Sequence, residues 1–178
     1  RFCARVLGGN IYAGQAVKLT ADIGPAQDPV TTKAGGVAGG YVKWFYGTFD
    51  GQSHTLYINY INDAPFMFTC YATIRNLHVA GNIFASSQFA ASIVSKTYYG
   101  INIENCRSSV AFNSIVPGDG THGGFIGVSY SSDNNGDINI TGCVFDGSFT
   151  TTNGTNSCGG FIGWTEKPSM TTITNCDL

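Results

Sequence analysis

Short apolar runs recur along most of this chain, and closely similar runs return about every thirty residues. Four copies begin at Ile74, Ile103, Ile140 and Ile173 and read Ile-Arg-Asn-Leu, Ile-Glu-Asn-Cys, Ile-Thr-Gly-Cys and Ile-Thr-Asn-Cys. The steps between them are 103 − 74 = 29, 140 − 103 = 37 and 173 − 140 = 33 residues. A unit of this size is typical of solenoids, propellers and repeat arrays.

A second pattern keeps step with the first. Residues 123–127 and 159–163 both read Gly-Gly-Phe-Ile-Gly, residues 91–95 are a softer copy, and residues 64–68 are a distant one. A third apolar run follows each Asn-Cys corner. Runs of Ile, Val, Phe and Thr between Gly, Asn, Asp and Ser are typical of strands joined by turns. The pattern therefore predicts an all-β fold, a parallel β-helix with three short strands per coil and about four to five coils. Its coiling is expected to be right-handed, as parallel crossovers nearly always are.

Other repeat folds fit less well. After Gly8 no stretch has the i, i+3, i+4, i+7 apolar spacing of a helix. The leucine-rich frame is absent, and a propeller blade needs about 40–45 residues and four strands. An ordinary β-sandwich remains the alternative. It gives no reason for core residues to repeat in register.

The N-terminal part lacks the repeat. Residues 2–7 place Phe2, Val6 and Leu7 on one helical face, and Gly8-Gly9 ends the helix, which is expected to cap the first coil. Strands are expected over 16–23, 42–46 and 55–61, with a loop over 24–40. We expect one domain over 1–178, with an N-terminal cap and first strands over 1–62 and repeated coils over 63–178. The chain is expected to belong to a longer surface protein, in which further coils or a partner cover its last coil.

Composition restricts the function. Charged residues make up only 11% of the chain, against about 25% in an average protein. Like charges stacked along neighbouring strands repel, so a stacked fold favours Asn, Thr, Ser and Gly. With 9 Lys and Arg and a net charge of −2, a nucleic-acid partner is not expected. No apolar span of about 18 residues occurs, so we expect no membrane insertion.

Leu77, Cys106, Cys143 and Cys176 occupy equivalent places in the four copies. Neighbouring coils lie about 4.8 Å apart, so a disulfide among these cysteines is sterically possible. Because Leu replaces Cys once, an inward ladder of free thiols is the favoured interpretation. A zinc site is disfavoured because no C-x-x-C occurs.

The residue before that position is Asn76, Asn105 or Asn175, and Gly142 in the third copy. Asn and Gly share a tolerance for the left-handed backbone conformation. The exchange therefore predicts a corner, where stacked amides form a structural ladder.

Candidate catalytic groups are sparse, and no catalytic residue, metal or cofactor is expected. Arg75 and Glu104 could form a surface ion pair, and His54 could brace its turn against Asp50. Asp119 and His122 share a Gly-rich loop that we interpret as a solvated turn. Residues 133–137 resemble a calcium loop in composition but lack its ligand spacing.

Aromatic residues make up 13% of the chain. Four of them follow the Gly-Phe-Ile-Gly strand of successive repeats and are candidate ligand-binding residues: Tyr98, Tyr99, Tyr130 and Trp164. Exposed rings with polar tips are common in recognition surfaces. These side chains could form one column along an edge, where a glycan or a host or bacterial surface protein could bind. The alternative interpretation is that the rings only cover the ends of strands.

The segments Tyr12-x-Gly14-x4-Leu19-Thr20-Ala21-Asp22-Ile23 and residues 47–56, Gly-Thr-Phe-Asp-Gly-Gln-x-His-Thr-Leu, together with the later copies, resemble the GLUG-motif repeat proteins. Ser53 departs from the pattern, where Gly is common, and residues 66–68 nearly lose the Gly-rich copy. The resemblance implies a right-handed parallel β-helix and an extracellular or cell-surface role in bacteria, gut bacteria among them, often adhesive. It supplies no catalytic residues.

Two functions follow as hypotheses. The first is a non-catalytic surface module, adhesin-like or structural. The second is a lyase or glycoside hydrolase acting on polysaccharides, which would need clustered carboxylates on one face.

Overall fold

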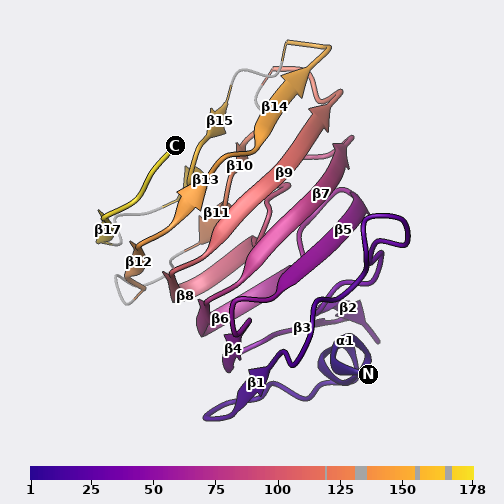
Figure 1. The fold of residues 1–178 in the computed structure, drawn as a ribbon, viewed down its shortest axis with the longest axis vertical. Helices are drawn as coiled ribbons and strands as arrows, with labels where there is room; N and C mark the ends of the chain where they lie inside the picture. Colours follow the sequence, from indigo (N-terminus) through magenta and orange to yellow (C-terminus); the bar gives the residue numbers. More distant parts are fainter. Residues whose placement is uncertain (119, 131–135, 155–156, 167–169) are drawn as a thin grey trace.

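The computed structural model describes residues 1–118, 120–130, 136–154, 157–166 and 170–178. These residues form mostly β-structure in parallel sheets (Figure 1), so the all-β prediction is confirmed. The largest sheet has the pairing order β1-β4-β6-β8-β11-β16, and β12 pairs with both β8 and β17. Its strands are β1 (Ala16–Lys18), β4 (Thr48–Asp50), β6 (Phe66–Arg75), β8 (Val94–Glu104), β11 (Ile126–Tyr130), β12 (Ile138–Thr141), β16 (Ile162–Thr165) and β17 (Thr171–Thr174).

A second sheet of five strands lies in front of the first in Figure 1, in the order β13-β9-β7-β5, with β14 also paired to β9. Its strands are β5 (Thr55–Ile61), β7 (His78–Ala85), β9 (Arg107–Ser114), β13 (Val144–Phe145) and β14 (Ser148–Thr151). A short parallel pair joins β10 (His122–Gly123) to β15 (Cys158–Gly159).

The sequence repeats lie side by side in space. Ile74 pairs with Ile103, Ile103 with Ile140, and Ile140 with Ile173. Each step along the sheet is therefore one step along the sequence repeat.

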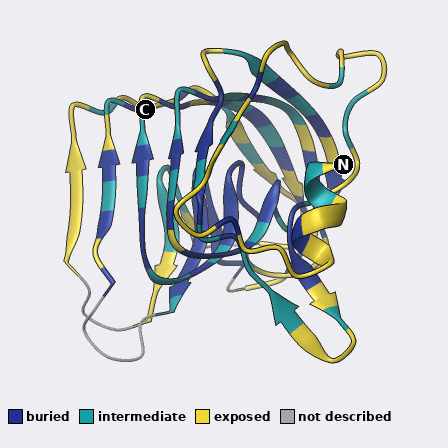
Figure 2. Cartoon of the chain, turned by 90° about the horizontal axis from the view of Figure 1, so that it is seen from below, coloured by how far each residue is buried: buried dark blue, intermediate teal, exposed yellow. Residues whose placement is uncertain are grey.

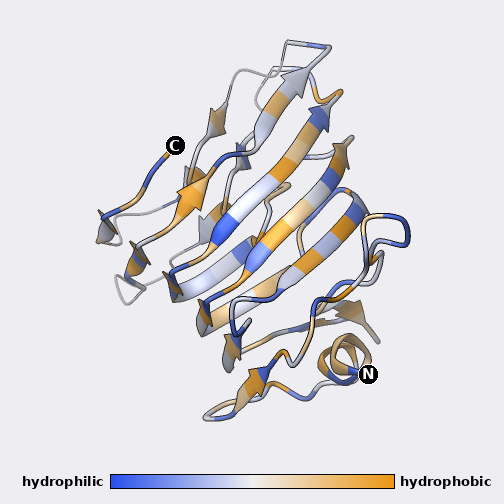
Figure 3. Cartoon of the chain, viewed as in Figure 1, coloured by the Kyte–Doolittle hydropathy of each residue, from blue (hydrophilic) through white to orange (hydrophobic). Residues whose placement is uncertain are grey.

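The core lies between the sheets, as the distribution of buried residues in Figure 2 shows. Ile74, Ile103 and Ile140 are fully buried, and so are Ile83 and Phe112 on the facing sheet. Along β5, β7 and β9, buried positions largely alternate with more exposed ones. Figure 3 shows that hydrophobic and hydrophilic residues are interspersed along these strands. That period of two is the pattern of a sheet with one face in a core.

The expected three separate strands per repeat are wrong for two repeats. In β6 and β8 the first two apolar runs join into one strand of 10 or 11 residues, with a register shift between Cys70 and Ala72. Later in the chain the same two runs are the separate strands β11 and β12. A bulge absorbs the corner in the longer strands, where Tyr71 and Tyr99 adopt positive φ.

The repeated Gly-Gly-Phe-Ile-Gly has a packing reason. A Cβ atom at Gly123 would overlap the carbonyl oxygen of Ile126, and one at Gly159 would overlap that of Ile162. The chain folds back on itself too closely for any side chain at these positions. The identical segments therefore encode the same tight approach in two neighbouring repeats.

At the N-terminal end of the sheets lies helix α1 (Phe2–Leu7), as predicted. Val6 is fully buried, and the Phe2 ring lies 5.4–5.6 Å from the rings of Phe45 and Phe49. Leu7 was expected on the same face but is exposed.

Three predictions between residues 16 and 46 need correction. The strand expected over 16–23 ends at Lys18, and Ile23 makes only an isolated bridge to Leu56. Part of the expected loop is the strand β2 (Gly36–Ala38), which forms an antiparallel hairpin with β3 (Tyr41–Lys43). The strand expected over 42–46 therefore ends at Lys43, and Phe45 makes only an isolated bridge to Thr69. Gly39 and Gly40 both have positive φ, which a two-residue hairpin turn requires.

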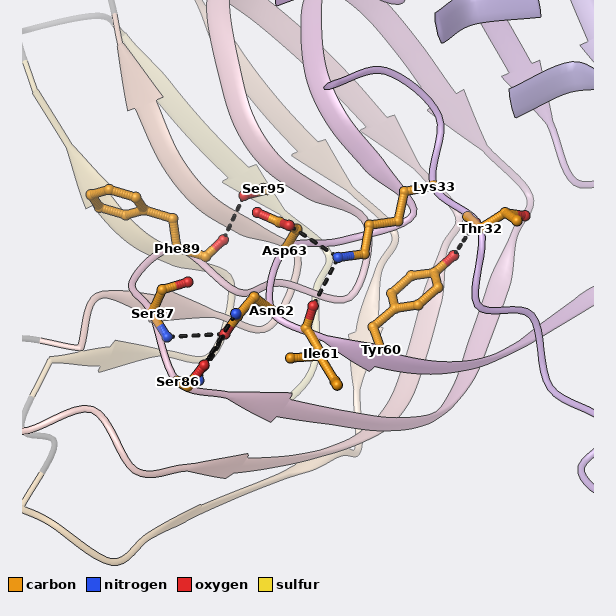
Figure 4. Close-up of polar contacts among 10 residues, drawn as sticks. All are labelled: Thr32, Lys33, Tyr60, Ile61, Asn62, Asp63, Ser86, Ser87, Phe89 and Ser95. Carbon is orange, nitrogen blue, oxygen red and sulfur yellow. Dashed lines mark hydrogen bonds and ion pairs between the residues drawn. The ribbon is translucent and has the colours of Figure 1, made fainter. Parts of the chain in front are cut away.

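The segment before this hairpin is fastened to the second sheet by polar contacts (Figure 4). The Lys33 ammonium donates to the carbonyl oxygen of Ile61 at 2.8 Å and to the Asp63 carboxylate at 3.0 Å. The Tyr60 hydroxyl donates to the carbonyl oxygen of Thr32 at 2.9 Å. These bonds connect residues 32–33 to the C-terminal end of β5, in a part of the chain that lacks the sequence repeat.

Candidate functional site

The predicted interior ladder lies at the corner that follows β6, β8 and β12. Leu77, Cys106 and Cys143 are buried, and Cys176 is half-buried in the last repeat. The backbone N–H of Cys106 donates to the Cys143 sulfur at 3.4 Å, and that of Cys143 to the Cys176 sulfur at 3.4 Å. Each thiol in turn faces backbone carbonyls, as Cys143 does toward Thr141 at 3.4 Å.

These contacts give the cysteines a structural task. Burial raises the pKa of the Cys106 thiol, so it stays protonated and can donate. All six cysteines of the chain are free. The ladder satisfies backbone groups at a corner, and its inner thiols, Cys106 and Cys143, are buried away from solvent.

The residues before the ladder have the backbone that the Asn/Gly exchange predicts. Asn76, Asn105 and Asn175 have φ of 51°, 50° and 54°, and Gly142 has φ of 64°. The left-handed conformation turns the chain between the two sheets.

The expected charge pairs are wrong. Arg75 bonds to Asp50 at 3.0 Å rather than to Glu104, and His54 faces Asp22 at 3.2 Å rather than Asp50. Asp50 is only 3% exposed and accepts from Gln52 N–H and Asn76 Nδ2 as well. Burial alone would raise the pKa of Asp50, but these hydrogen bonds outweigh it and hold the pKa well below its ordinary value.

His122 is not part of a solvated turn, because its side chain is fully buried and its Nε2 lies 2.9 Å from the Ser114 hydroxyl. Desolvation lowers the pKa of this imidazole. Asp119 and residues 133–135 of the calcium-like segment lie outside the described residues.

Three of the four predicted ligand-binding aromatics gather on the outer face of the large sheet. Tyr98 and Tyr130 are register partners on β8 and β11, with ring centroids 5.0 Å apart. Trp44 meets the Tyr98 ring edge-on at 4.8 Å. Trp164 on β16 is 45% exposed and is the register partner of Val128, which precedes Tyr130 by two residues on β11. We call these four residues the aromatic strip.

Polar groups border the aromatic strip. Tyr130, Trp164 and Glu166 line a shallow hollow of about 190 Å³ together with Gln88 and Phe89. Burial, and after it the nearby Glu166 carboxylate, raises the pKa of Tyr98. The strip therefore offers flat rings with hydrogen-bonding groups at their edge, and its tyrosines remain neutral donors.

Lys96 adds a cation to the same surface. Its ammonium lies 5.6 Å from the Phe68 ring centroid and 5.4 Å from that of Phe89. Such contacts hold a lysine head group in place beside the rings.

Tyr99 does not join the expected column. It is stacked on Tyr71 with ring centroids 5.7 Å apart and an interplanar angle of 20°. Both residues have positive φ, 49° at Tyr71 and 58° at Tyr99, which costs about 1–3 kcal/mol for a residue other than glycine. Stacking returns about 0.5–1.5 kcal/mol. The left-handed backbone turns Tyr99 away from its neighbour Tyr98.

Sequence reasoning missed four participants: Trp44, Tyr71, Phe89 and Lys96. Trp44 precedes the repeats, so no copy marks its place beside Tyr98. Tyr71 and Tyr99 do have a signal. Tyr71 stands one residue before Ala72, Tyr99 stands two residues before Ile101, and Ala72 and Ile101 are register partners in the paired strands. That alignment could have placed them together.

Comparisons with protein-family models, with curated proteins and with solved structures find no match for this chain. Within the described part of the chain, no helix is both long and apolar enough to cross a membrane. The described residues also contain no group of three or more His, Cys, Asp or Glu side chains that could hold a metal ion.

Proposed function

We propose that this chain is a non-catalytic glycan-binding module, and that the aromatic strip is its binding surface. The observation that carries the proposal is the row of rings on successive strands of one outer sheet face, Tyr98 beside Tyr130 with Trp164 on the next row. The apolar face of a sugar packs on such a ring, and its hydroxyls bond to the polar groups around it.

The shape of the surface favours a polymer over a small ligand. A hollow of about 190 Å³ is smaller than the 300–1,000 Å³ that usually encloses a small molecule. A shallow row of rings instead contacts several units of an extended chain weakly. Affinity then comes from the number of contacts made at once.

The charge pattern supports a binding role over a catalytic one. Glycosidases need two free carboxyl groups about 5–10 Å apart. Four of the nine described carboxylates are held by cationic side chains or His54, in the pairs Asp50–Arg75, Asp63–Lys33, Asp146–Arg107 and Asp22–His54. Among the described residues no three or more His, Cys, Asp or Glu side chains gather into a group that could hold a metal ion.

For the architecture we propose a right-handed parallel β-helix. Parallel pairing of equivalent residues in successive repeats supports it, and the usual hand of parallel crossovers supplies the direction of coiling. The resemblance to GLUG-motif proteins favours a place outside the bacterial cell, at its surface or secreted, with a glycan or a surface protein as partner.

The test is binding of the purified chain to a panel of insoluble and soluble polysaccharides, by pull-down and by affinity electrophoresis. We expect retention by at least one neutral polysaccharide, and loss of retention in the triple variant Y98A/Y130A/W164A. Tyr41→Ala is the matched control, because Tyr41 is 72% exposed on the separate β2–β3 hairpin.

Circular dichroism should show that all variants keep the wild-type spectrum. Equal binding by the triple variant and the wild type would contradict the proposal, as would no retention of the wild type by any polysaccharide.

A further inference from the structure

A second surface with the chemistry of a sugar site lies beside the aromatic strip, at the bulge of β6 and β8. Tyr71 and Tyr99 are stacked there, and Tyr71 is 58% exposed, so one ring face is open to a ligand. We call this pair the tyrosine platform. It borders a separate hollow of about 220 Å³ that shares no lining residue with the hollow at Trp164.

The backbone under the platform is unfavourable for tyrosine. Both residues occupy the left-handed region, which glycine adopts without cost, and this chain places glycine at comparable turns such as Gly142. Two aligned repeats nevertheless carry Tyr. The strained backbone holds both rings outward at the bulge, and stacking on each other recovers only part of its cost.

Amide groups line the floor of the hollow. Asn139 Nδ2 donates to Asn102 Oδ1 at 3.0 Å, and Asn102 Nδ2 lies 3.5 Å from the Thr73 hydroxyl. This row uses one N–H of each amide, so each retains a second N–H for a ligand. The row is fixed by strand register, since Thr73 pairs with Asn102 and Asn102 with Asn139.

A carboxylate completes the rim. Asp137 is exposed and lines the hollow, and its backbone carbonyl accepts from Ile101 N–H at 3.0 Å, which fixes its place beside Gly100. No Lys or Arg is among the described residues that line it. A carboxylate and amides suit the neighbouring hydroxyls of a neutral sugar, whereas an acidic sugar would be repelled.

We infer that the tyrosine platform, with Asn102, Asn139 and Asp137, is a second binding site for one neutral sugar unit of a polysaccharide. The unit stacks on Tyr71 while two adjacent hydroxyls bond to Asp137 and the amide row. The inference rests on the proposed function for its ligand class, but its site is separate.

The experiment is an NMR titration of the whole chain, whose 18.8 kDa mass suits it. The probes are cellohexaose, xylohexaose and mannohexaose, with hexagalacturonate as the charged comparison. We expect at least one neutral probe to shift the side-chain amide signals of Asn102 and Asn139 and the ring signals of Tyr71 and Tyr99. We expect hexagalacturonate to leave them in place.

Two variants separate the sites. In Y71G/Y99G, glycine relieves the backbone strain, so the fold should persist while the Asn102 and Asn139 shifts disappear. In Y71F/Y99F, the rings remain and the shifts should persist. In Y130A/W164A, the aromatic strip is lost but the shifts at Asn102 and Asn139 should remain.

Shifts confined to the strip residues would overturn this inference and leave the proposed function standing. Shifts at Asn102 and Asn139 that survive in Y130A/W164A would support it even if the strip itself binds nothing. No shift at these amides with any neutral probe, or shifts with hexagalacturonate only, would also overturn it.

Discussion

Replacement of Asp50 by Asn should destabilise the protein far more than loss of an ordinary surface carboxylate. Asp50 ends β4 next to the corner and is 3% exposed. Its carboxylate accepts from Gln52 N–H at 3.0 Å, from Asn76 Nδ2 at 3.1 Å and from Arg75 Nε at 3.0 Å. An Asn side chain keeps the volume but turns a donor toward groups that are themselves donors.

The magnitude follows from these contacts. Hydrogen bonds to a charged group contribute about 1.5–3 kcal/mol each. The Arg75 side chain is 41% exposed, so its ion pair adds only about 0–1 kcal/mol. Since Asn retains one acceptor oxygen, we expect Asp50→Asn to lower the free energy of unfolding by roughly 3 kcal/mol. For a chain of this length that is a fall in Tm of about 6–12 °C.

The effect should depend on pH with a definite sign. The pKa of Asp50 is depressed in the folded state, so the unfolded chain takes up a proton first as the pH falls. The stabilisation is therefore present above about pH 4, the ordinary pKa of an aspartate, and is lost as the pH falls through the folded value. The difference between wild type and Asp50→Asn should shrink over that range.

Urea unfolding followed by circular dichroism at pH 7 and at steps below pH 4 measures both quantities. Asp146→Asn is the matched control, because Asp146 also bonds to an arginine but is more exposed, and its effect should be much smaller. Equal stability of the two variants at pH 7 would contradict this role of Asp50, as would a difference between wild type and Asp50→Asn that is unchanged at low pH.

Three further predictions concern other parts of the molecule. Desolvation lowers the pKa of His122 in the folded state, so below about pH 6.5 the unfolded chain binds a proton more readily than the folded one. The free energy of unfolding should therefore decrease from pH 7 to pH 5, and the decrease should be smaller in His122→Gln. Asn105→Ala should cost about 1 kcal/mol in urea unfolding because φ is 50°, while Asn105→Gly should cost clearly less; equal losses would rule out the backbone explanation. The purified chain should release neither reducing ends nor unsaturated products from a polysaccharide panel, and steady turnover would refute the non-catalytic assignment.

Several features of the fold were available from the sequence. The register of Ile74, Ile103, Ile140 and Ile173 could be predicted because stacked strands place equivalent residues of successive repeats beside one another. The corner at Asn105 and Gly142 was also predictable, since only a left-handed backbone explains that exchange. In a repeat protein, residues that pair across neighbouring strands occupy equivalent positions of successive repeats, so their contacts can be predicted from the sequence.

The charge pairs could not be predicted in the same way. Asp50 belongs to β4 in the unrepeated part of the chain, so no copy indicates that Arg75 turns toward it and away from Glu104. His54 faces Asp22 because Ile23 bridges to Leu56 across a segment without repeats. Such contacts depend on how the first strands dock.

The repeat, its corners and the side chains that fill the core could be predicted from the order of the residues, because they follow from a period that any stacked chain must keep. The division of the aromatic residues between two surfaces became apparent only in the folded chain. A left-handed backbone at Tyr99 sends its ring to Tyr71, while the neighbouring ring of Tyr98 meets Trp44 and Tyr130. Side-chain direction at a bulge is set by the local φ and by how the strands dock, and neither can be predicted from the spacing of residues in the sequence.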